Sequence, residues 1–166
     1  MKLHFVSAAA CVLLVSCGGG GDTPAGTMIN NAAPVVTPPA DLTTTSTLGS
    51  PNYVPKQFVV TDPEGGLVTV YFGTETSPTG LVEMGLPTAT GATFAPTTSS
   101  AVIWQTSHGA VAANASTIAY AYSGVVASGS TITVGIRGGG VLMVKAVDAG
   151  GVSSATPHQV TFVLQP

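Results

Sequence analysis

The chain has 166 residues, a formal net charge of −3 and only 7% charged residues. So few charges form no basic patch, which excludes nucleic acid as an expected partner. A mean hydropathy of +0.47 excludes an intrinsically disordered chain, and the length suits one folded domain with a short tether.

Residues 1–16 have the pattern of an export signal. Lys2 gives a short basic start, the stretch 5–15 is almost wholly apolar or small, and Ser16 is a small residue at the expected cleavage point. The apolar stretch is shorter than the roughly 20 residues that a membrane-spanning helix needs. We therefore expect residues 1–16 to be a signal peptide that is removed.

The run Leu14-Val15-Ser16-Cys17 resembles the lipobox of bacterial lipoproteins. The resemblance implies lipidation of Cys17 and attachment to a membrane through acyl chains, two or more of which anchor a protein durably. Gly18 rather than Asp follows the cysteine, which in that family favours the outer membrane or the cell surface. The alternative is an ordinary secretory signal that leaves Cys17 as a free thiol. Cys11 offers no disulfide partner, because it lies in the segment to be removed.

The rest of the chain divides into a tether and a domain. Residues 17–30 are rich in glycine and predict a flexible tether. The stretch 31–55 contains five prolines, which allow only an edge strand or an extended strap. We expect the folded domain to span residues 31–166.

Short alternating segments follow this strap and predict an all-β fold. In 131–136, for example, Ile132, Val134 and Ile136 share one face and the threonines the other. Each such strand buries one face, so two antiparallel sheets must pack as a β-sandwich. Strands are expected at 57–61, 67–72, 101–105, 117–122, 131–136, 141–147 and 159–164. The inward side chains are expected to include Val68, Val70, Phe72, Leu142, Val144, Ala146, Val160, Phe162 and Leu164, with Met143 and Lys145 outward.

A second resemblance covers both ends of the domain. Asn31–Val35 resembles the opening strand of bacterial cadherin-like and other Ig-like modules, and Asp62–Gly66 followed by Leu67–Val70 resembles their first hairpin. Val144–Gly151 with the last strand resembles their closing pair. The resemblance implies an Ig-like (cadherin-like) sandwich of about seven strands. Residues 73–129 are longer than the matching region of such modules and are expected to be a long insert.

Three acidic residues, Asp62, Glu64 and Asp148, are weak candidates for calcium ligands. Calcium takes six to eight oxygen ligands, several of them from carboxylates. In cadherin-type modules acidic residues at the sheet ends supply them, but here there is no Asp-x-Asp and no acidic triad. The alternative role for the two aspartates is to cap tight turns by accepting backbone N–H groups. We expect this role and no structural metal site.

No motif for catalysis is found. The nearest approach to a nucleophile elbow is Gly151–Ala155, which lacks the final glycine and leads to a strand rather than a helix. Glu75 and Glu83 flank a loop, but nothing in the sequence brings them together as a carboxylate pair. The glycine runs lack the residues of a phosphate loop. We expect neither an enzyme nor a bound cofactor.

The expected binding surface lies on the insert 73–129. Loops carry recognition because their side chains are not committed to packing, and the candidate residues here are Gln105, His108 and Asn114, supported by Trp104. His108 has no metal-ligand spacing to another residue. The aromatic residues Trp104, Tyr120 and Tyr122 could instead form a stacking platform for sugar, although core packing is the favoured role.

These features together predict a lipid-anchored protein of the bacterial cell envelope with a binding or structural role, such as adhesion or envelope assembly. Its expected partners are the membrane, through the lipid on Cys17, and a protein or polysaccharide ligand of unknown identity. One alternative is a carbohydrate-binding or hydrolytic lipoprotein that uses the insert 73–129. Another is a subunit of a filament or complex joined by edge-strand pairing through Gln159–Leu164, which carries no charge to block such pairing.

Overall fold

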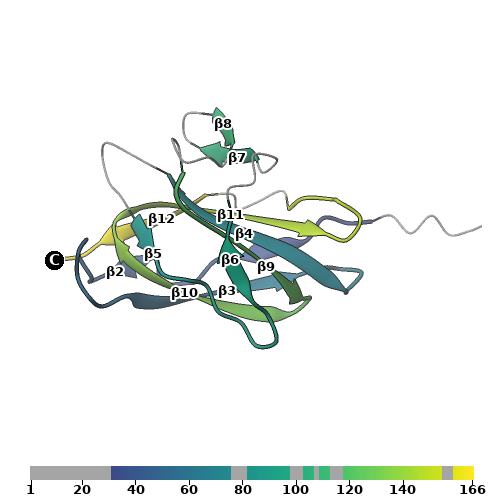
Figure 1. Cartoon of the computed structure of the whole chain (residues 1–166), viewed down its shortest axis with the longest axis horizontal. Coiled ribbons are helices and arrows are strands. Elements are labelled where there is room, and N and C mark those ends of the chain that lie inside the picture. Colours follow the sequence, from purple (N-terminus) through teal and green to yellow (C-terminus); the bar gives the residue numbers. More distant parts are fainter. Residues whose placement is uncertain (1–30, 76–81, 98–102, 107–108, 113–117, 155–158) are drawn as a thin grey trace, which may run out of the picture. The chain divides into compact units, whose positions relative to one another are not determined.

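Short segments rich in Val, Thr and Ile form β-strands throughout the part of the chain that the computed structural model describes (Figure 1). That part is residues 31–166 without 76–81, 98–102, 107–108, 113–117 and 155–158. The strands are β1 (Val35–Thr37), β2 (Thr43–Thr44), β3 (Val54–Thr61), β4 (Leu67–Glu75), β5 (Val82–Met84), β6 (Phe94–Pro96), β7 (Ile103–Thr106), β8 (Gly109–Ala112), β9 (Ile118–Ala127), β10 (Ser130–Gly138), β11 (Gly140–Asp148) and β12 (Gln159–Leu164).

Ten of these strands form two sheets, so the fold is all-β, as the alternation predicted. One sheet has the order β1-β3-β10-β5 and is antiparallel throughout. The other has the order β2-β12-β11-β4-β9-β6, with β2 and β12 parallel and the remaining pairs antiparallel. Strands β7 and β8 pair only with each other. Within the described ranges no helix is long and apolar enough to cross a bilayer.

The two sheets share one hydrophobic core. Phe58 on β3 and Phe72 on β4 meet edge to face, with ring centroids 5.4 Å apart, and so join the sheets. Each such fully buried side chain contributes about 1.5–3 kcal/mol by transfer from water. The predicted inward residues of β4 and β10 are buried, which confirms the alternation there. The core comprises Val36, Phe58, Val60, Val68, Val70, Phe72, Val82, Met84, Phe94, Val126, Ile132, Val134, Ile136, Leu142, Val144, Ala146, Val160 and Phe162.

Two side chains differ from the expected pattern. Met143 occupies an outward position on β11 but is fully buried, because β7 lies beside β11 and the outer face of this sheet is covered there. Leu164, expected inward, is 39% exposed. Its strand leaves β11 after the pair Phe162–Gly140 and pairs with β2 instead, so Leu164 lies beyond the edge of the core.

The segment Asp62–Gly66 was predicted to close a hairpin and does not. It joins β3 to β4, which lie in different sheets, so it crosses from one layer to the other. The crossing is tied to the β9–β10 turn, since Ser128 accepts the N–H of Asp62 at its Oγ (2.8 Å) and donates its own N–H to the carbonyl of Gly66 (2.8 Å). The expected closing pair, by contrast, is present as the antiparallel pair β11–β12.

The region 73–129 contributes strands to both sheets. Strand β5 pairs with β10, β9 pairs along most of β4, and β6 forms the edge beyond β9. The described residues therefore form more strands than the seven or so expected, and among these strands only β7 and β8 have no pairing partner in the two main sheets.

Candidate functional site

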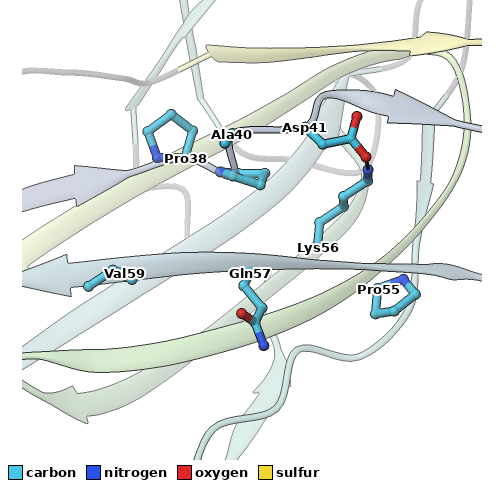
Figure 2. A pocket seen from close by; sticks show the side chains of 8 residues that line it. Pro38, Ala40, Asp41, Pro55, Lys56, Gln57 and Val59 are labelled. Carbon is cyan, nitrogen blue, oxygen red and sulfur yellow. Dashed lines mark hydrogen bonds and ion pairs between the residues drawn. The ribbon is translucent and has the colours of Figure 1, made fainter.

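A groove opens where the chain passes from one sheet to the other after β1. The β1–β3 ladder ends at the pair Thr37–Val59, because Pro38 and Pro39 have no N–H to continue it. The chain then runs as a strap to β2 and leaves a groove of about 400 Å³ beside the first half of β3 (Figure 2). The groove is lined by Pro38, Pro39, Ala40, Asp41, Pro55, Lys56, Gln57 and Val59.

An ion pair holds the strap against β3. Lys56 lies on the inward row of β3 beside Phe58, is only 5% exposed, and extends its ammonium to Asp41, with Nζ and Oδ2 2.8 Å apart (Figure 2). The N–H and hydroxyl of Thr43 donate to the other carboxylate oxygen of Asp41 at 2.8 and 2.7 Å. The hydrogen bonds from Lys56 and then Thr43 hold the pKa of Asp41 well below its usual range. The polar groups of the groove thus fix the strap.

The three candidate calcium ligands lie at the crossing between the sheets and the loop after β11. Asp62 and Asp148 are distant in the sequence, and both are buried. Each accepts a backbone N–H from the turn that it begins, Asp62 from Glu64 at 3.2 Å and Asp148 from Val152 at 2.9 Å. The second oxygen of Asp148 accepts the side-chain amide of Asn31 at 3.0 Å.

The surroundings of Asp62 in this cluster disfavour the ionised form of its carboxyl group. Burial raises the pKa of Asp62, an effect that the N–H of Glu64 opposes and that the carboxylates of Glu64 and Asp148 increase. Glu64 in turn accepts the N–H of Ala32 at 3.1 Å. In the described part of the chain, no three His, Cys, Asp or Glu residues are arranged to hold a metal ion. The contacts observed for the two aspartates include those with the N–H groups of their own turns.

A second polar surface lies on the outer face of the β1-β3-β10-β5 sheet. The guanidinium carbon of Arg137 on β10 lies 4.6 Å from the ring centroid of Tyr53, a cation–π contact. Arg137 also donates to the carboxylate of Glu83 on β5 and to the carbonyl of Ser50. Tyr53 covers Gly135, where an added Cβ would come within 2.8 Å of the tyrosine Cβ.

The other predicted site residues are placed only in part. Trp104 and Gln105 belong to β7, opposite Val111 and Ala110 of β8. His108, Asn114 and the lipidation candidate Cys17 lie outside the described residues. The expected binding surface on the insert stays a prediction.

Among the remaining aromatic and catalytic candidates, several described side chains make contacts within the fold. Tyr122 packs partly buried against the hydrophobic core, as favoured for the aromatic residues. Ser153, at the nucleophile position of the stretch considered as an elbow, is half-buried and forms an isolated β-bridge with Val147. Its neighbour Ser154 is buried and accepts the N–H of Ala146 at its Oγ (3.0 Å). Glu83 is bound by Arg137. Tyr122, Ser154 and Glu83 are thus each engaged in packing, a hydrogen bond or an ion pair.

No family model, curated protein or solved structure matches the chain. The sequence reasoning missed two contacts that the fold creates, between Lys56 and Asp41 and between Tyr53 and Arg137. The first had a signal in the sequence, since Lys56 continues the inward row of Phe58 and Val60 and a lysine there needs a partner. The second had none, because Tyr53 precedes its strand and Arg137 lies near the end of another.

Proposed function

We propose that the chain is a lipid-anchored module of the bacterial cell envelope that binds or supports another molecule and carries out no catalysis. The observation that carries the proposal is the lipobox resemblance at Leu14–Cys17, followed by a glycine-rich tether and a β-sandwich. Two or more acyl chains at Cys17 would hold the sandwich at a membrane surface, while the tether gives it reach.

We further propose that the sandwich is Ig-like. The strands β1, β3, β4, β5, β10, β11 and β12, taken in chain order, can be equated with strands A to G of an Ig domain. The order β1-β3-β10-β5 then corresponds to A-B-E-D, and β4-β11-β12 corresponds to C-F-G. Strands β6 and β9 extend the second sheet beside β4 but enter between D and E in the chain, which is the departure from that topology.

A binding or structural role is supported by how the described polar groups are used. The carboxylates of Asp62 and Asp148 accept backbone N–H groups, Lys56 fixes the strap, and Glu83 holds Arg137. Side chains that are committed in this way maintain loops and strands in fixed positions. A rigid domain displayed on a membrane through a tether suits adhesion or envelope assembly.

Fractionation of cells that produce the full chain tests the anchor. Cys17→Ser should move the protein from the membrane fraction to the soluble fraction, because no acyl chain can be attached. Cys11→Ser is the matched control, since it removes a cysteine from the same segment and should leave the protein in the membrane fraction. Equal membrane partition of Cys17→Ser and the unchanged chain after carbonate washing would refute the lipoprotein proposal.

One observation favours edge-strand pairing as an alternative function. Strand β2 pairs with Val163 and Leu164 at the end of β12, and in the described part of the chain no second strand pairs with Val160–Phe162 on the side away from β11. Chemical cross-linking at increasing protein concentration distinguishes the alternatives. A ladder of oligomers that Thr161→Pro abolishes would favour edge pairing, whereas a monomer at all concentrations favours the tethered module.

A further inference from the structure

We infer that the outer face of the β1-β3-β10-β5 sheet binds an uncharged glycan, along β10 from Thr131 to the ring of Tyr53. The inference rests on the proposed binding role and deepens it by naming the class of ligand and the surface that receives it. It places the ligand on the face of a sheet and uses residues other than the predicted Gln105, His108 and Asn114.

One part of this surface is a groove lined by threonine. Its volume is about 450 Å³, and it lies between β10 and the segment that follows β5. Thr88 and Thr133 exchange two backbone hydrogen bonds of 2.9 and 2.8 Å, so the floor of the groove is fixed. No charged residue lines the groove, which is formed by Thr88, Ala89, Thr90, Thr131 and Thr133.

The chemistry of the groove matches that of a sugar. A threonine hydroxyl both donates and accepts a hydrogen bond, as a sugar hydroxyl does, so four of them can pair with a ligand in either sense. The backbone groups that Thr88 and Thr133 exchange are already paired with each other. An extended peptide would bind through backbone groups at an open strand edge, and this floor offers hydroxyls instead.

The aromatic ring of Tyr53 continues the same face of the sheet. Gly135 follows Thr133 by two residues, so both positions lie on the outer face of the sheet, about 7 Å apart. The tyrosine lies over Gly135 and near Gly85, where a Cβ would be 3.9 Å from the ring, and it is still 39% exposed. A ring that the glycines and Arg137 hold in place loses little entropy on binding, which suits stacking against the C–H face of a sugar.

The charges beside the ring select an uncharged ligand. The guanidinium of Arg137 is paired with the carboxylate of Glu83 and with the carbonyl of Ser50, so the positive charge is balanced within the protein. An acidic sugar would have to compete with Glu83 for Arg137, whereas a neutral one leaves this pair intact. Hydroxyls, one aromatic ring and a neutral ion pair together favour a neutral glycan.

Calorimetry on the full chain in detergent tests the inference. The neutral probes are hexasaccharides of glucose, mannose and galactose, and the acidic probe is a galacturonic acid hexamer. At least one neutral probe should bind. Tyr53→Ala should raise the Kd of that probe about fivefold, which corresponds to the free energy of one aromatic contact. Thr133→Val, which removes a hydroxyl at equal volume, should also weaken binding. Tyr53→Phe should retain it, and Thr161→Val on β12 is the control that should leave the Kd unchanged.

The inference is overturned if no neutral probe binds at millimolar concentration, or if the acidic hexamer binds more tightly than every neutral one. It is also overturned if Tyr53→Ala and Thr133→Val both bind with the original Kd, because the glycan would then occupy another surface. If Tyr53→Ala or Thr133→Val lacks the thermal transition of the original chain, that variant is unfolded, and the Kd of the other variant decides the test. Loss of glycan binding leaves the fractionation of Cys17→Ser unaffected, so the two proposals fail independently.

Discussion

Phe94 and Gly124 are in contact across the β6–β9 pair, so closely that a Cβ on Gly124 would come within 2.7 Å of the phenylalanine ring. The ring is almost fully buried and packs against Phe72, with centroids 6.1 Å apart. Strand β6 has only three residues, so this one side chain fixes much of it to the core. The edge of the sheet thus depends on a glycine in the neighbouring strand.

Gly124→Ala is therefore expected to destabilise the domain. The added methyl group must displace the Phe94 ring, and overpacking of this kind costs about 1–3 kcal/mol of unfolding free energy. Gly85→Ala is the control, because its Cβ would meet nothing closer than 3.9 Å and its φ is not positive. Urea denaturation should show a lower midpoint for Gly124→Ala alone. Equal midpoints for the two variants would contradict the packing argument.

Neighbouring positions on β10 are expected to respond in opposite ways to the same change. Ile132 is fully buried between the sheets, so Ile132→Asp places a carboxylate in the core and should unfold the domain. Thr133 points to the outer face, where a carboxylate stays hydrated, so Thr133→Asp should cost less than about 1 kcal/mol. Far-UV circular dichroism during heating measures both. A folded Ile132→Asp protein would show that this face is not the core.

How far the sequence predicts the fold depends on strand length. The nine residues of β10 alternate over enough positions to define a buried face, and each range that alternation predicted overlaps an observed strand. Strands β1, β2, β5 and β6 have two or three residues each, which is too few for a period to be recognised. The layer in which a strand lies is a tertiary property, which is why Asp62–Gly66 was mistaken for a hairpin.

The site follows the same division. Residue type alone identified Asp62, Glu64 and Asp148, but only the crossing between the sheets brings Asp148 near Asp62. The contact between Tyr53 and Arg137 depends on which strands are neighbours and on a glycine that leaves room for the ring. Periodicity contains no information about such neighbours, so these groups could not be predicted before the fold was known.

The ion pair between Lys56 and Asp41 is expected to be asymmetric. Lys56 is 5% exposed and Asp41 is 69% exposed, so Asp41→Asn leaves a buried ammonium without its counter-ion, whereas Lys56→Met leaves a carboxylate in water. Asp41→Asn should therefore lower the urea midpoint at pH 7 more than Lys56→Met does. The reverse order would show that the ammonium reaches solvent when the strap is released.

The same pair predicts a loss of stability in acid. The pKa of Asp41 in the folded chain is below its ordinary value of 3.8, so the folded state binds this proton less readily than the unfolded state. The contribution of Asp41 is present above pH 3.8 and is lost as the pH falls below that value toward the lowered pKa. The difference in midpoint between the original chain and Asp41→Asn should shrink correspondingly, as measured by urea titrations from pH 7 downward.

The opposite sign is expected for Asp62. Its pKa in the folded chain is raised above the ordinary value of 3.8, so the folded state holds this proton more tightly than the unfolded state. The stabilising effect of protonation is present below pH 3.8 and is lost as the pH rises through the raised pKa. Asp62→Asn should therefore raise the melting temperature at pH 7, because the amide oxygen can still accept the N–H of Glu64. The gain should disappear at pH 3.

Calcium distinguishes this explanation from a metal site at the same carboxylates. If Asp62 only caps its turn, millimolar calcium should leave the melting temperature of the original chain unchanged, and chelator should have no effect. If Asp62, Glu64 and Asp148 bound the ion, calcium would relieve their repulsion and raise the melting temperature by several degrees, and Asp62→Asn would abolish that rise. Asp148→Asn is the second variant, since it disturbs the contact with Asn31 and should destabilise the loop in either case. A calcium-dependent rise lost in Asp62→Asn would refute the capping role and establish a metal site.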